Sequence, residues 1–241
     1  MTEKFCNKSA EETTFADIEQ NYRYITENIA EAMDKAGRHD SVRLMAVTKT
    51  VPCEKINYAE KLGIKLLGEN RVQEFLGKCE NYSPDSEIHF IGGLQNNKVK
   101  YIIDKVAMIH SVDGIKLAGE INHRAAAHNL VMDILLEINI GGEESKGGLP
   151  ADDFIETARA AAELENIRIR GLMSIPPAGG DEKYFAQMQE LFENARIKYP
   201  FLSGMETLSM GMSGDYMSAV KYGSTIVRIG SGLFGYRNYA K

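Results

Sequence analysis

Short apolar runs alternate with amphipathic stretches along most of the chain. The first amphipathic stretch, residues 15–36, carries apolar side chains at steps of three and four, which predicts a helix with one buried stripe. Eight apolar runs then alternate with segments of helical pattern. They lie at residues 43–49, 64–70, 88–93, 106–113, 131–139, 167–175, 205–210 and 225–230. We interpret these runs as strands.

The alternation predicts an α/β fold with parallel strands. Strands separated by helices pair in parallel, because each connection must cross back over the sheet. Eight such units in about 200 residues match a small (β/α)8 barrel of the TIM type, here with an extra N-terminal helix. An open doubly wound sheet usually carries a GxGxxG turn after its first strand, and that turn is absent. No linker divides residues 1–241, so we expect a single barrel domain.

Composition narrows the possible partners and the compartment. The chain has 34 acidic and 28 basic residues and a formal net charge of -6, which gives no electrostatic reason to expect nucleic acid. Its three cysteines, Cys6, Cys53 and Cys79, show neither disulfide-framework nor zinc-site spacing. No apolar stretch approaches the roughly 20 residues of a membrane span, and the N-terminus is polar. These features predict a cytoplasmic protein without a metal or a membrane partner.

Polar side chains gather where the predicted strands end. In a barrel, the carboxyl ends of the strands meet at one face and form the site. Taken singly, each of these residues could be an ordinary strand-to-loop residue, so the set is more informative than its members. It includes Lys49, Asn70, His89, Ser209 with Met210, and Arg228 with Gly230.

Lys49 and Arg228 are the two cations of this set. Lys49 ends the run LMAV, and partial burial at a barrel mouth would favour the neutral amine that Schiff-base formation requires. A solvated loop lysine is the alternative. Arg228 shares a strand face with Ile226 and Gly230, so it points either into the barrel or against the helices.

Two turns of small residues follow the last two predicted strands. The first contains Ser209, Gly211, Ser213 and Gly214 and precedes a helix that Asp215 is expected to cap; the second is Gly230-Ser231-Gly232. Small residues let backbone N–H groups approach an anion, and barrels often bind phosphate after strands seven and eight. With the two cations, these turns predict a phosphorylated ligand that carries an aldehyde.

Several segments in order along the chain resemble the pyridoxal phosphate homeostasis protein family, whose barrel is similar to the N-terminal domain of alanine racemase. They are LMAVTKTVP, LGENRVQE, HFIGGLQNNK, IHSVDG, EINIGGEESKGG, RGLMSIPP, LSMGMSGDYMSAV and VRIGSGLFGYR.

The resemblance implies that pyridoxal 5′-phosphate (PLP) forms a Schiff base with Lys49 and that Arg228 faces the pyridine nitrogen. It also implies a phosphate surrounded by side chains and amides of Ser209, Ser213, Gly230 and Ser231, and a ring lined by Asn70, His89 and Met210. The family usually has Thr where this chain has Ser231, which keeps the hydroxyl. No role follows for the loop of residues 143–146 after the fifth strand.

The resemblance further implies a protein of vitamin B6 homeostasis that holds PLP and passes it to PLP-dependent apo-enzymes, as a monomer or weak dimer. A racemase-like PLP enzyme is the main alternative. That chemistry needs an acid or base on each face of the cofactor, and the short sequence after residue 230 supplies no obvious second one. We therefore expect no catalytic residue and no substantial turnover. A barrel that uses Lys49 as an aldolase lysine is a third reading, which predicts a colourless protein.

Overall fold

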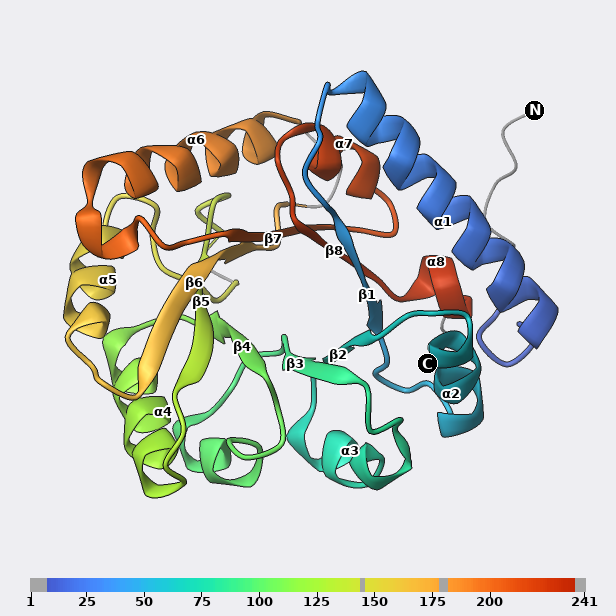
Figure 1. The fold of residues 1–241 in the computed structure, drawn as a ribbon, viewed down its shortest axis with the longest axis horizontal. Helices are drawn as coiled ribbons and strands as arrows, with labels where there is room; N and C mark the ends of the chain where they lie inside the picture. Colours follow the sequence, from blue (N-terminus) through green and yellow to red (C-terminus); the bar gives the residue numbers. More distant parts are fainter. Residues whose placement is uncertain (1–7, 144–145, 178–181, 237–241) are drawn as a thin grey trace.

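Eight parallel strands close into a barrel in the computed structural model, which describes residues 8–143, 146–177 and 182–236 (Figure 1). Each strand pairs with the next in chain order, and β1 closes the ring by pairing with β8, where Arg43 lies opposite Ile226. The strands are β1 Arg43–Val47, β2 Leu66–Glu69, β3 Glu87–Phe90, β4 Met108–Val112, β5 Met132–Ile138, β6 Ile167–Ser174, β7 Thr207–Met212 and β8 Ile226–Ile229. The predicted (β/α)8 barrel and all of its strands are thereby confirmed.

Helices surround the barrel and occupy the connections between strands (Figure 1). The α-helices are α1 Phe15–Lys35, α2 Cys53–Lys61, α3 Val72–Leu76, α4 Ile115–Ala127, α5 Phe154–Ala162, α6 Glu182–Lys198, α7 Tyr216–Lys221 and α8 Ser231–Phe234. Short 3-10 helices lie at Cys79–Asn81, Asn96–Tyr101 and Pro200–Leu202. None of the described helices is long and apolar enough to cross a membrane.

The extra N-terminal helix, α1, forms where the sequence pattern predicts it. It begins at a capping box, in which the Thr14 hydroxyl accepts from the Asp17 backbone N–H and the Asp17 carboxylate accepts from the Thr14 N–H. Its buried stripe includes Ile18, Ile25 and Ile29. This stripe packs on α7 and α8, so α1 covers the side of the barrel where β8 ends (Figure 1).

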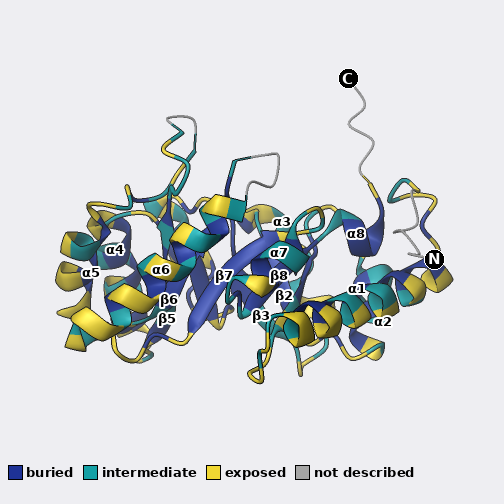
Figure 2. Cartoon of the chain, turned by 90° about the horizontal axis from the view of Figure 1, so that it is seen from above, coloured by how far each residue is buried: buried dark blue, intermediate teal, exposed yellow. Residues whose placement is uncertain are grey.

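Apolar side chains fill two separate regions. Those directed outward from the strands join the helices in one large cluster, and the helices turn exposed faces to solvent (Figure 2). Inside the barrel the apolar residues form two small clusters instead. The first is Met45, Val47, Leu66, Ile91 and Ile226, and the second is Met108, Leu135 and Met173. The first cluster belongs to the β8-β1-β2 side and the second to β4, β5 and β6.

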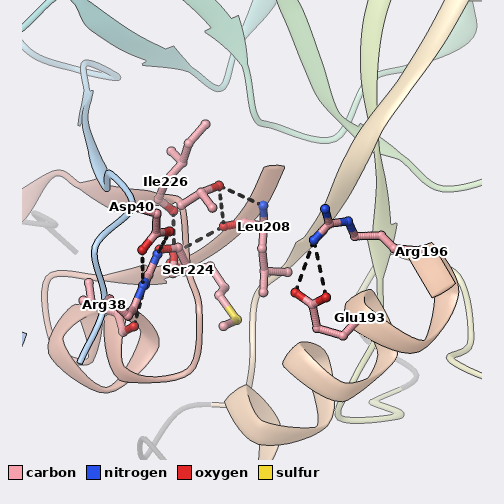
Figure 3. A network of polar contacts seen from close by, with 10 residues as sticks. Arg38, Asp40, Glu193, Arg196, Leu208, Ser224 and Ile226 are labelled. Atoms are coloured by element: carbon pink, nitrogen blue, oxygen red, sulfur yellow. Dashed lines mark hydrogen bonds and ion pairs between the residues drawn. The ribbon is translucent and has the colours of Figure 1, made fainter. Parts of the chain in front are cut away.

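Polar contacts hold the segment that leads into β8 at the amino-terminal end of the barrel (Figure 3). The Arg38 guanidinium donates to the carbonyl oxygens of Val220, at 2.6 Å, and Ser224, at 2.9 Å. The buried Ser224 hydroxyl lies 2.8 Å from the Met210 carbonyl oxygen and 3.0 Å from that of Ile226. Arg38 and Ser224 thus tie the turn between α7 and β8 to the carbonyl oxygens around it. The candidate site, which the sequence predicts at the carboxyl ends of the strands, lies at the opposite end of the barrel.

Candidate cofactor site

A pocket of about 430 Å³ opens at the carboxyl ends of β1, β7 and β8. Its size is in the range of small-molecule sites. The described residues that line it are Val47, Lys49, Met212, Ser213, Gly214, Arg228, Gly230, Ser231 and Tyr236. Two cations, three hydroxyls and two glycines are present and no carboxylate is, so the lining of the described pocket suits an anion.

The turn that carries Lys49 is held on both sides by side chains. The sequence predicts Lys49 as the last residue of the first strand. β1 instead ends at Val47, so Lys49 lies two residues beyond the strand, where it is half-buried. Thr50 follows with φ of 62°, a left-handed conformation unusual for a residue with a branched side chain. The Thr50 backbone N–H donates to the Glu74 carboxylate, and Lys78 Nζ donates to the Thr48 carbonyl oxygen at 3.0 Å.

The next residues inward from this turn are also bonded. The buried Thr48 hydroxyl donates to Glu69 Oε1 at 2.5 Å, and the Tyr82 hydroxyl donates to the same oxygen at 2.5 Å. Lys78 also pairs with Glu74. The two residues that flank Lys49 are thereby fixed, which limits the directions in which the lysine amine can point.

Replacement of Glu74 by alanine should loosen this turn. The Thr50 N–H would lose its acceptor, and Lys78 would lose its ion-pair partner. The free energy of unfolding should therefore fall by about 1 to 3 kcal/mol. Urea denaturation measures it. Glu80→Ala, which removes an exposed carboxylate on a neighbouring 3-10 helix, is the control and should change stability by less than about 0.5 kcal/mol. Equal effects of the two changes would contradict a role for Glu74 in the turn.

Arg228 points into the barrel, which decides between the two orientations that the sequence left open. Val227 and Ile229 on either side pack in the outer cluster. The Arg228 residue is 4% exposed; its Nη1 donates to Ser209 Oγ at 2.8 Å and its Nη2 to the Ser174 carbonyl oxygen at 2.9 Å. Burial lowers the pKa of Arg228 to about 10, so the group stays positively charged at neutral pH.

The loops after β7 and β8 are joined by a hydrogen bond. The Ser213 hydroxyl oxygen accepts from the Gly232 backbone N–H at 3.0 Å. Asp215 precedes α7 as expected, but its carboxylate makes no capping bond to the helix; it accepts from the Met212 backbone N–H at 2.6 Å and so closes the loop instead.

A glycine is required where the β7 loop turns toward the pocket. Gly211 has φ of +88°, and a Cβ placed there would lie 2.4 Å from the Ala219 Cβ on α7. The register between β7 and β8 shifts between Ser209 and Met212, at this residue. The irregularity brings Met212, Ser213 and Gly214 to the pocket.

The structure therefore brings together Lys49, Ser213, Arg228, Gly230 and Ser231 of the residues that the sequence singled out. The other four lie elsewhere. Ser209 is buried under the pocket as a partner of Arg228, and Met210 is directed into the outer cluster, away from the barrel interior. His89 is fully buried inside the barrel, and Asn70 follows β2 outside the pocket lining.

Sequence reasoning missed two inward-facing titratable groups near Arg228. His110 on β4 is fully buried, with Nδ1 3.2 Å from Ser209 Oγ. Burial, together with the nearby charge of Asp113, raises the pKa of Glu137 on β5 to about 7, although Arg228 acts to lower it. Strict alternation in MDILLEI puts Asp133, Leu135 and Glu137 on one face, and this signal could have identified Glu137.

Among the described residues, no group of three or more His, Cys, Asp or Glu side chains could hold a metal ion. Cys6, together with Glu144 and Ser145 of the loop after β5, lies outside the described residues.

Comparisons with known proteins show what the chain is similar to. Residues 21–238 match the model of the family "Alanine racemase, N-terminal domain". The pyridoxal phosphate homeostasis protein of Aquifex aeolicus is 45% identical over 221 residues, covering 89% of this chain and 96% of the relative. That of Escherichia coli K12 is 36% identical over 234 residues, covering 93% and 99%.

Solved structures agree with the fold. PipY of Synechococcus elongatus, solved with PLP bound, superposes with a TM-score of 0.75 at 32% identity, covering 86% of this chain and 100% of that one. An alanine racemase of Clostridium difficile has a TM-score of 0.64 at 17% identity; this chain covers 58% of it, and at this identity the likeness shows the fold alone.

Proposed function

Because this chain belongs to the alanine racemase N-terminal domain family, among the pyridoxal phosphate homeostasis proteins, we propose that it binds PLP at the mouth of its barrel, through a Schiff base on Lys49. One observation carries the proposal. A lysine, a buried arginine and two small-residue turns from distant parts of the sequence line a single pocket. PipY, which was solved with PLP bound, supports the same cofactor here.

The donors of the pocket fit the two polar ends of PLP. The hydroxyls of Ser213 and Ser231, with backbone N–H groups of their small-residue turns, are donors suited to a phosphate. Barrels commonly bind phosphate with the loops after strands seven and eight and a short helix, and α8 is such a helix. The lysine amine is the group that bonds an aldehyde. No acidic side chain of the described lining opposes the phosphate charge.

Arg228 supports a carrier rather than a catalyst. When bound, PLP supplies an aldehyde and a pyridine ring that can withdraw electrons. That capacity depends on a protonated ring nitrogen, and a fixed positive charge beside the nitrogen lowers its pKa. The resemblance assigns this position to Arg228, which remains charged because its pKa stays near 10. The chain would then take up, shield and hand over PLP to apo-enzymes without substantial turnover.

An amino-acid racemase-like enzyme is the second candidate, favoured by the shared fold and by Glu137. Its pKa of about 7 is suited to an acid or base. Racemase, decarboxylase and transaminase assays over a panel of amino acids, run with PLP-loaded protein, separate the two functions. We expect rates equal to those of free PLP. Enzyme-dependent loss of chirality in alanine, abolished by Glu137→Gln, would establish the enzyme and contradict the carrier.

A further inference from the structure

A chain of polar side chains crosses the barrel interior and ends on Arg228. Glu87 Oε1 lies 2.7 Å from His89 Nε2, and His89 Nδ1 lies 2.8 Å from His110 Nε2. His110 Nδ1 lies 3.2 Å from Ser209 Oγ, which accepts from Arg228 Nη1 at 2.8 Å. His89, His110 and Ser209 are fully buried.

The chain begins in contact with solvent. Glu87, at the start of β3, is partly exposed, and Arg43 at the start of β1 donates to both of its oxygens, at 3.0 and 2.6 Å. The chain therefore runs from the amino-terminal face of the barrel to the cofactor pocket at the other end. It spans from β3 and β4 to β7 and β8, between the two apolar clusters of the interior.

An apolar core would fill this space at lower cost than two imidazoles, because buried polar groups are costly unless each has a partner. Here each ring nitrogen has one. The rings are neutral, since burial lowers the pKa of both His89 and His110. A satisfied network of this kind fixes one arrangement of its members.

Only one placement of hydrogens satisfies the chain. Hydrogen bonds from His89 and Arg43 lower the pKa of Glu87 to about 2, so its carboxylate only accepts and His89 Nε2 must donate. His89 Nδ1 then accepts from His110 Nε2–H, and His110 Nδ1 accepts from the Ser209 hydroxyl. The Ser209 proton thus points away from Arg228, and only oxygen lone pairs face the guanidinium.

We propose that His89 and His110 are positioning residues for Arg228, a role that rests on the PLP-binding function proposed above. They orient the Ser209 hydroxyl as an acceptor, so that Nη1 is held by Ser209 and Nη2 by the Ser174 carbonyl. The remaining donors of the guanidinium are left for the ring of the cofactor. The negative charge of Glu87 polarises the chain and strengthens this hold.

Other charged groups act on the same chain and must be counted in any pH titration. Asp133 on β5 and Arg43 on β1 act on His89, and Arg228 and Arg43 act on His110. Glu137 and Asp215 act on Arg228. The pKa of Glu137, about 7, falls in the neutral range, so Glu137→Gln belongs in the experiment as a background that removes its titration.

The hydrogen assignment is tested in the unaltered protein, without cofactor, by ¹⁵N NMR of the histidine rings. We expect both buried imidazoles to be neutral with the proton on Nε2, and to remain so as the pH is lowered through the neutral range. A proton on Nδ1 of either buried ring, or titration of either near neutral pH, would overturn the directed chain.

The positioning role is tested by the pH titration of the visible absorbance band of PLP-loaded protein. In His110→Leu the Ser209 hydroxyl loses its acceptor, so Ser209 no longer holds Arg228 in one position. The charge of Arg228 then lowers the pKa of the pyridine nitrogen less, and the midpoint of the titration should rise by about one pH unit. Ser209→Ala should move it in the same direction. His110→Gln, which keeps one acceptor and one donor, should restore the original midpoint, and His128→Leu is the surface control.

An unchanged midpoint in both His110→Leu and Ser209→Ala, with the visible band retained, would overturn the positioning role and leave the proposed function intact. Absence of that band from the unaltered protein mixed with PLP would overturn the Schiff base and, with it, this inference.

Discussion

Pyridoxal, which lacks the phosphate, should bind at least about a hundredfold more weakly than PLP. Hydrogen bonds to a charged group contribute about 1.5 to 3 kcal/mol each, and each 1.4 kcal/mol is tenfold in affinity. Two such bonds from the turns that contain Ser213 and Ser231 are enough for this difference. Equilibrium dialysis of the two compounds against the same protein measures it.

Single serine variants locate the phosphate. Ser213→Ala and Ser231→Ala should each weaken PLP retention by roughly five- to hundred-fold, which corresponds to about 1 to 3 kcal/mol. Ser213→Ala also releases the Gly232 N–H, so its effect should be the larger. The control is Ser203→Ala, an exposed serine that follows the 3-10 helix Pro200–Leu202 and lies outside the pocket lining, with no expected effect. Equal binding of pyridoxal and PLP would contradict a phosphate site after β7 and β8.

Replacement of Lys49 by alanine should abolish the visible imine band while PLP still binds without a covalent bond. The remaining affinity should still depend on the phosphate, because Ser213, Ser231 and the backbone amides are unchanged. Lys49→Arg keeps the positive charge but cannot form the imine, so it should also lack the imine band. Lys61→Ala, an exposed lysine at the end of α2, is the control and should keep the band. A normal band in Lys49→Ala would place the cofactor on another lysine.

The barrel could be predicted because its evidence is local. Each strand has its own apolar run, and the period of the pattern changes between strand and helix. The pocket could also be predicted in part, since parallel strands bring their carboxyl ends to one face of the barrel. Lys49 and Arg228 lie 179 residues apart along the chain. This rule alone puts them, together with Gly230, in one pocket.

The rest depends on irregular or long-range geometry. Met210 was expected at the ring, yet on β7 it alternates with Ser209 and so faces the helices when Ser209 faces inward. The shift at Gly211 then returns the chain to the pocket, and nothing in a period-two pattern marks it. The contact of His110 with Ser209 joins β4 to β7 across the interior, which depends on the register of the closed barrel.

Borohydride reduction of the PLP-loaded protein, followed by mass spectrometry of the modified peptide, identifies the lysine that holds PLP. We expect a phosphopyridoxyl group on Lys49. The same mass on a different lysine, or on none, would contradict it.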